Sequence, residues 1–166
     1  MCAEKPVLRV ADVRFGKLNE LLGRFGLSLR LLDDGEPITG SYWGESEAGV
    51  VGRGVYVRLD TPIHSLLHET CHVICMDEDR RAGLERDAGG DDLEEAAVCY
   101  LQILLADYLP GVGRDRLMQD MDAWGYSFRL GNSRAWFESD AADARAWLLE
   151  QGLLDAAGTP AFVLRK

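Results

Sequence analysis

The three histidines of this chain lie in one short stretch, at positions 64, 68 and 72. Residues four apart on an α-helix lie on the same face, one turn above the other. The imidazoles of His68 and His72 can therefore reach a single metal ion. Glu69, next to His68, can take a proton from a water held by that ion. The spacing predicts two ligands of a metal site with Glu69 as its catalytic base.

A catalytic zinc ion usually has three protein ligands and one open position, so a third ligand is expected elsewhere. The acidic start of the helical pattern at 91–105 offers Glu94 and Glu95. Glu94 falls on the apolar side, where a lone carboxylate is costly unless it is paired or bound to metal. Glu95 falls on a more polar side with Gln102, and it occupies the capping-box position if Asp92 is the N-cap. We favour Glu94 as the third ligand and keep Glu95 as the alternative.

Other candidate ligands lie beside this motif. His64 is one turn before His68, but each four-residue step also rotates by about 40° around the helix axis, so three rings converge poorly on one ion. We expect His64 to be a helix-start residue or a substrate contact. Cys71 and Cys75 could bind zinc as thiolates, but small buried side chains are the simpler interpretation. All four cysteines are expected to be free thiols: Cys2, Cys71, Cys75 and Cys99.

The apolar periodicity predicts an α+β fold, with a small N-terminal sheet followed by helices. Thr61 is the expected N-cap of the histidine-bearing helix, with Pro62 at its first position. Ser139 is the expected cap of the last helix. The predicted strands cover 27–31, 50–51 and 55–59, the last two forming a hairpin or a single bulged strand. The predicted helices cover 15–25, 62–77, 91–109, 114–123 and 140–151.

The two motifs together resemble the gluzincin branch of the zincin metallopeptidases. They are closest in style to small intracellular peptidases that act on bacterial repressors, with the pattern H-E-x-G-H followed by E-x-x-A-N-x-F-A-x-x-L-L. The resemblance covers about residues 55–107. Cys71 replaces the usual glycine, and Val98 replaces a polar residue that often supports a ligand. The second motif reads Glu94-x-x-Ala97-Val98-x-Tyr100-Leu101-x-x-Leu104-Leu105.

The resemblance implies a zincin-like, minimal gluzincin domain spanning residues 1–166. It implies zinc (Zn²⁺) on His68, His72 and Glu94, Glu69 as general base, and a strand at 55–59 that lines the substrate cleft. The implied activity is zinc-dependent hydrolysis of a peptide bond in a peptide or protein substrate. The alternative is a zincin-fold regulatory or binding module whose metal is structural or vestigial and which has no hydrolytic activity.

The composition limits the class of partner. The chain has 166 residues, is 47% hydrophobic and carries a formal net charge of −10. This composition is typical of one globular domain, and the acidic surface disfavours nucleic acid and anionic membranes as partners. No apolar run is long enough to span a bilayer, and the polar start does not resemble a signal peptide. Together with unpaired cysteines, these features predict a cytoplasmic protein.

Overall fold

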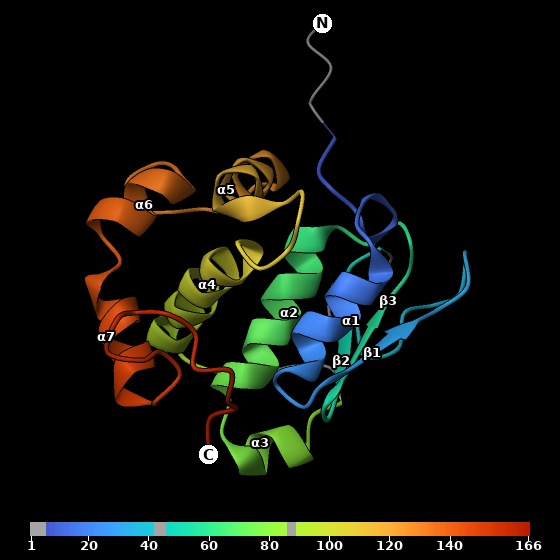
Figure 1. Ribbon diagram of the computed structural model, residues 1–166, viewed down its shortest axis with the longest axis horizontal. Coiled ribbons are helices and arrows are strands. Elements are labelled where there is room, and N and C mark those ends of the chain that lie inside the picture. Colours follow the sequence, from blue (N-terminus) through green and yellow to red (C-terminus); the bar gives the residue numbers. More distant parts are fainter. Residues whose placement is uncertain (1–5, 42–45, 86–88) are drawn as a thin grey trace, which may run out of the picture.

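The histidine-bearing helix lies at the centre of the molecule. The computed structural model describes residues 6–41, 46–85 and 89–166, so Cys2 lies outside the described residues. The fold is α+β, with a three-stranded sheet and, in these ranges, seven α-helices and a short 3₁₀ turn. Helix α2 (Ile63–Cys75) packs between the sheet and helix α4 (Asp92–Ala106), and α7 (Ala142–Glu150) covers the far side of α4 (Figure 1).

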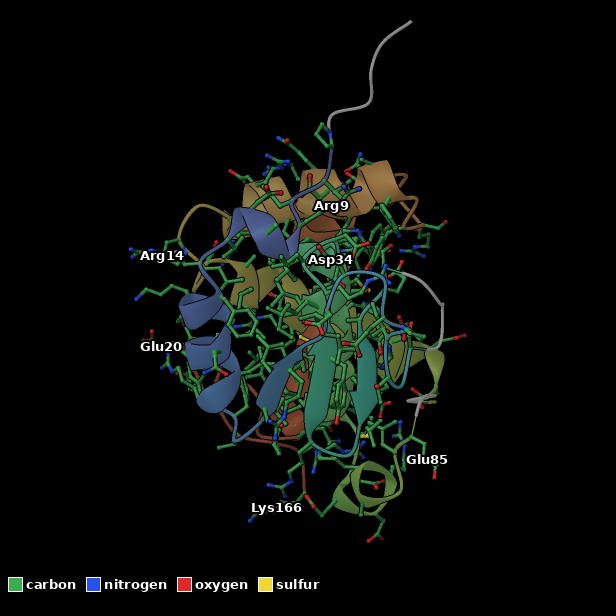
Figure 2. The ribbon with its side chains drawn as sticks, turned by 90° about the vertical axis from the view of Figure 1, so that its right-hand side faces the viewer. Arg9, Arg14, Glu20, Asp34, Glu85 and Lys166 are labelled. Carbon is green, nitrogen blue, oxygen red and sulfur yellow. The ribbon has the colours of Figure 1, made fainter. Side chains whose placement is uncertain are left out.

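The sheet packs against one side of α2. Its strand order is β1-β3-β2, in which β3 pairs parallel with β1 and antiparallel with β2. Val51 lies opposite Gly54, which confirms the predicted hairpin. Val55 and Val57 are fully buried, and Figure 2 looks onto the opposite face of the sheet. The strands are β1 (Ser28–Leu31), β2 (Gly49–Val51) and β3 (Gly54–Val57).

The sheet order corrects the expectation that the strand at 55–59 lines a substrate cleft. That segment corresponds to β3, which is the central strand and is paired along both edges. Glu47, which precedes β2, lines the pocket beside the histidines instead.

Helix α2 begins one residue later than predicted, with Pro62 at the N-cap. The hydroxyl of Thr61 accepts the backbone N–H of Arg58 at 2.9 Å, so it does not cap the helix. Every residue of α2 except His68 is buried, because the sheet, α4 and α5 cover it on several sides. Cys71 and Cys75 are free thiols within the hydrophobic core, as expected.

The remaining helices pack around this centre. The prediction missed helix α6, whose N-cap Asn132 accepts the backbone N–H of Ala135 at 2.8 Å. Ser139 is the last residue of α6 and does not cap α7. No helix in the described ranges is both long and apolar enough to cross a membrane. The further helices are α1 (Phe15–Gly23), α3 (Glu78–Ala82), α5 (Gly113–Trp124) and α6 (Ser133–Ser139).

Candidate metal centre

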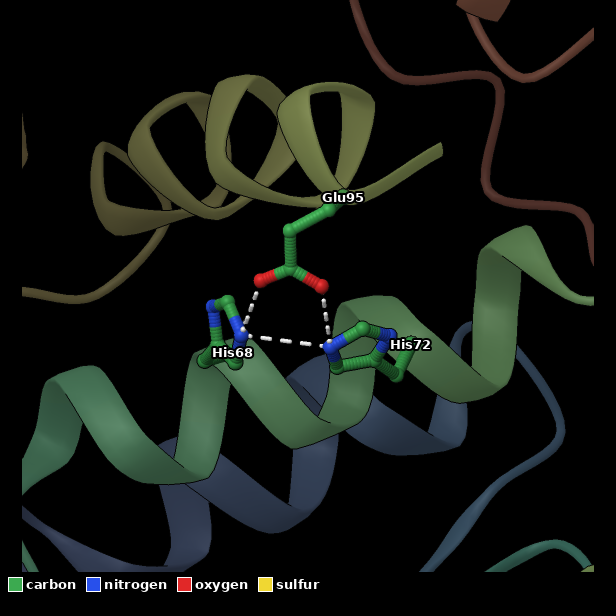
Figure 3. A group of neighbouring side chains, drawn as sticks. All are labelled: His68, His72 and Glu95. Atoms are coloured by element: carbon green, nitrogen blue, oxygen red, sulfur yellow. Dashed lines mark hydrogen bonds and ion pairs between the residues drawn. The ribbon is translucent and has the colours of Figure 1, made fainter. Parts of the chain in front are cut away.

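Three potential ligands converge between α2 and α4. His68 and His72 lie on one face of α2, with their Nε2 atoms 3.2 Å apart. Glu95, in the first turns of α4, faces both rings: Oε1 is 2.9 Å from His68 Nε2 and Oε2 is 3.0 Å from His72 Nε2 (Figure 3). Within the described part of the chain, this is the only group of three His, Cys, Asp or Glu ligand atoms that lie within 4.8 Å of one another.

The structure does not bring Glu94 to the histidines, and this corrects the preferred assignment. The Glu94 carboxylate receives two hydrogen bonds from Arg80, each 2.8 Å long, and lies 3.2 Å from Arg165 Nη1. The helix starts one residue earlier than the capping argument assumed, because the side chain of Asp91 accepts the N–H of Glu94 at 2.8 Å. Glu94 therefore occupies the N3 position, and arginines compensate its buried charge. Glu95 takes the position beside the histidines.

Gln102 supports the site from the same side of α4 as Glu95. Its side chain is fully buried, and its Nε2 donates to the backbone oxygen of His64 at 2.8 Å. Its Oε1 lies 2.9 Å from Nδ1 of His68. Gln102 thus provides the polar support that Val98 cannot give. Glu95 and Gln102, two polar residues seven apart on a largely apolar helix, were the sequence signal for the face that meets the histidines.

The Gln102 contacts determine the tautomer of His68. A carbonyl oxygen can only accept, so the amide nitrogen of Gln102 must face His64, and its oxygen must face His68. Nδ1 of His68 therefore carries the proton. In a neutral imidazole the lone pair of Nε2 then points toward the Glu95 carboxylate and His72. Two electron-rich atoms at this distance repel each other unless a cation lies between them or a proton is added.

The pKa shifts agree with a site that requires positive charge. Burial acts to lower the pKa of His68, but contributions from Tyr126, Cys99 and Glu95 raise it well above its ordinary value. Burial acts to raise the pKa of Glu95, but hydrogen bonds from His68 and His72 hold it well below its usual range. The carboxylate is therefore ionised and faces the two rings.

The donor set is one that zinc can bind. Zinc binds imidazole nitrogen and carboxylate oxygen at about 2.0–2.2 Å, so tetrahedral ligand atoms stand roughly 3.3 Å apart. The two histidine Nε2 atoms are 3.2 Å apart, close to that value, and the Glu95 carboxylate approaches each ring with a different oxygen, at 2.9 and 3.0 Å. The Gln102 contact to the second nitrogen of His68 is the kind of support that metal-binding histidines usually have. Nδ1 of His72 is buried without a hydrogen-bond partner among the described residues.

Glu69 lines a pocket of about 370 Å³ that opens beside His68 and Glu95. Its side chain is almost fully buried, with 7% of the residue exposed, and its carboxylate makes no hydrogen bond or ion pair with any other described residue. Burial raises the pKa of Glu69, and the nearby His72 and His68 oppose this rise. A buried carboxylate without partners at the wall of a pocket is suited to accept a proton.

His64 is not part of the ligand group, as the geometric argument predicted. Its Nδ1 lies 3.1 Å from the hydroxyl of Tyr126, and its ring packs against Trp124 with centroids 5.0 Å apart. Burial, with the neighbouring His68, lowers the pKa of His64 to about 3. The pocket is also lined by Glu47, Trp124 and Tyr126, which lie in loops and at a helix end. No sequence motif predicted these residues.

No protein-family model, curated protein or solved structure matches this chain. The candidate ligands come from α2 and α4, and the candidate base comes from α2. The rest of the pocket wall comes from the segment before β2, the end of α5 and the residues after it.

Proposed function

We propose that this protein is a zinc-dependent metallopeptidase in which His68, His72 and Glu95 hold the metal and Glu69 is the general base. The observation that carries the proposal is the convergence of three ligand atoms at a pocket whose wall also holds a buried carboxylate without partners. Structural zinc sites are usually closed by four protein ligands, whereas three ligands leave a position for water and substrate. The open pocket therefore favours catalysis over a purely structural metal.

The roles follow from the surroundings of each residue. A bound zinc ion would polarise the scissile carbonyl and lower the pKa of a bound water toward neutrality. Glu69, whose pKa is raised by burial, would take the proton of that water and pass it to the leaving amine. Gln102 would hold the His68 ring in the tautomer that presents Nε2 to the metal.

The resemblance to gluzincins supports the same conclusion. A His, His and Glu ligand set with the base next to the first histidine is the arrangement that the resemblance implies. In this chain the glutamate lies one residue later than the motif alignment placed it, at Glu95. The proposed function depends on the positions of His68, His72 and Glu95 and on Glu69 in the adjacent pocket wall.

Substitution of Glu69 by Gln tests the proposed base. The amide cannot accept the proton, so cleavage of a peptide library should fall by about 10²-fold or more while the protein still binds about one zinc per chain. Zinc is measured by elemental analysis and cleavage by mass spectrometry. Glu138→Gln, at an exposed glutamate outside the pocket, is the matched control and should behave like the wild type.

Undiminished cleavage by the Glu69→Gln variant would refute the assignment of the base. Stable zinc binding by the wild type without cleavage of any peptide would instead favour the regulatory or binding module with a structural metal.

A further inference from the structure

One carboxylate in the pocket has no role in the proposed chemistry. Glu47 lines the pocket from the segment before β2, next to Ala48, whose backbone N–H donates to Ser65 of α2 at 2.9 Å. Oε1 of Glu47 accepts the indole Nε1–H of Trp124 at 3.0 Å. Its Oε2 has no hydrogen bond with a described residue. This bond orients the carboxylate and the indole relative to each other and leaves one oxygen for a ligand.

Trp124 is unusual in its exposure. It is the last residue of α5, and 42% of its surface is exposed although it lines the pocket. Gly125 follows in a left-handed conformation, with φ of 108°, and a side chain built there would meet no atom within 4 Å. This turn places Trp124 and Tyr126 together on the wall without a side chain between them. A large exposed aromatic surface at a pocket is typical of a binding site.

The described lining of the pocket is acidic. Three carboxylates line it, from Glu47, Glu69 and Glu95, and none of the described lining residues is a lysine or arginine. A metal ion on His68, His72 and Glu95 would leave the Glu47 carboxylate without a positively charged side chain beside it in this lining. Glu69, of which 7% is exposed, lines the same pocket with its carboxylate.

We propose that this pocket binds a cationic group of the substrate, next to the bond that is cut, through the Glu47 carboxylate and the face of the Trp124 ring. The inference rests on the proposed peptidase function and specifies its substrate class. Carboxylate and indole together suit an ammonium or guanidinium group, because an ion pair and a cation–π contact act on the same charge. The group is either a Lys or Arg side chain or the free α-amine of the peptide.

The size of the pocket limits what it accepts. Its volume of about 370 Å³ lies at the lower end of ligand pockets. A pocket of this volume can hold one residue of a peptide and its immediate neighbour. Selectivity should then depend on a single charged group at a defined distance from the scissile bond.

Peptide binding to the zinc-loaded Glu69→Gln variant tests this inference without turnover. One lysine is moved along an otherwise neutral, acetylated and amidated peptide, with norleucine at the same position as the uncharged control. A third peptide has a free α-amine and no lysine. Isothermal titration should show that a cationic peptide binds roughly fivefold or more tighter than its neutral control, which corresponds to one partly desolvated ion pair. The lysine and free-amine series show which cation the pocket selects.

Substitution of Glu47 by Gln in the same background should remove this preference, and Glu138→Gln should retain it. Equal binding of lysine and norleucine peptides, absence of peptide binding, or an unchanged preference after Glu47→Gln would each overturn the inference. Cleavage by the wild type without charge preference would refute this inference and leave the proposed function intact. A charge preference in binding without any cleavage by the wild type would refute the proposed function and leave the cation-binding pocket.

Discussion

Two adjacent glutamates have opposite environments in this protein. Glu94 is buried and bound by Arg80 and Arg165, whereas Glu95 is half-exposed and faces His68 and His72. Successive helical residues are separated by about 100°, so the two carboxylates point to different neighbours. Glu94 and Glu95 were both candidates from the sequence, and the cost of a buried carboxylate favoured Glu94, whereas the structure places Glu95 beside the histidines. The arginines that compensate Glu94 come from distant segments and could not be identified from periodicity.

The third ligand can be tested with two matched substitutions. Glu95→Gln removes a charged ligand and should weaken zinc binding by about 10- to 100-fold or more, because an amide is a poor zinc ligand. Glu94→Gln should leave zinc affinity close to that of the wild type. Competition with a chromophoric chelator measures both. Loss of zinc only in the Glu94 variant would restore the original assignment.

The buried His64 predicts a pH dependence of stability. The folded state keeps His64 neutral down to a pKa of about 3, whereas the unfolded chain binds a proton below the ordinary value of 6.5. The unfolded state therefore holds more protons between these values, so the free energy of unfolding rises with pH in this window. As the pH falls from 6 toward 4, the metal-free wild type should lose up to about 1.4 kcal/mol more per pH unit than His64→Leu does.

Urea unfolding of both metal-free proteins at several pH values measures this difference in slope. His68 lies close to His64 and titrates in both proteins, so the comparison separates the contribution of His64 from that of the metal site. Parallel curves for the two proteins would contradict a neutral, buried His64.

Helices and hairpins with a strong local sequence pattern were predictable, whereas the pairing of strands that are distant in the sequence was not. The helices at 15–23 and 63–75 and the hairpin of β2 and β3 follow from apolar periodicity and a short turn. The parallel pairing of β1 with β3 depends on segments more than twenty residues apart, and it makes β3 the central strand. Helix α6 has only seven residues, so its periodic signal was too short to recognise.

At the contact between α2 and α4, Gln102 orients His68 of the candidate centre. Gln102→Leu should remove the acceptor that orients His68 and should lower zinc affinity by about 10- to 100-fold, while zinc remains the preferred ion. Gln119→Leu, at an exposed position on α5, is the control and should bind zinc like the wild type. Chelator competition again provides the measurement. Equal zinc affinity of the Gln102 variant and the wild type would show that His68 does not need this support.

At the scale of the whole molecule, the candidate centre lies between two central helices. Helix α2 follows β3, and α4 comes after the short helix α3, so an ion between α2 and α4 would connect helices that are not consecutive in the sequence (Figure 1). The C-terminal segment contacts the same two helices. The backbone N–H of Arg165 donates to the backbone oxygen of Ile74 in α2 at 3.0 Å, and the Arg165 side chain contacts Glu94 in α4. The acidic helix start therefore contributes to the candidate centre through Glu95 and to the packing of the C-terminal segment through Glu94.

The most direct test of the account is an anomalous difference map from crystals of the zinc-loaded wild-type protein. The account predicts one strong peak between α2 and α4, about 2.0–2.2 Å from Nε2 of His68, Nε2 of His72 and a carboxylate oxygen of Glu95. At least one position on the ion should face the pocket that Glu69 lines. The absence of a peak at this place, or a peak coordinated by Glu94 in place of Glu95, would contradict the central claim.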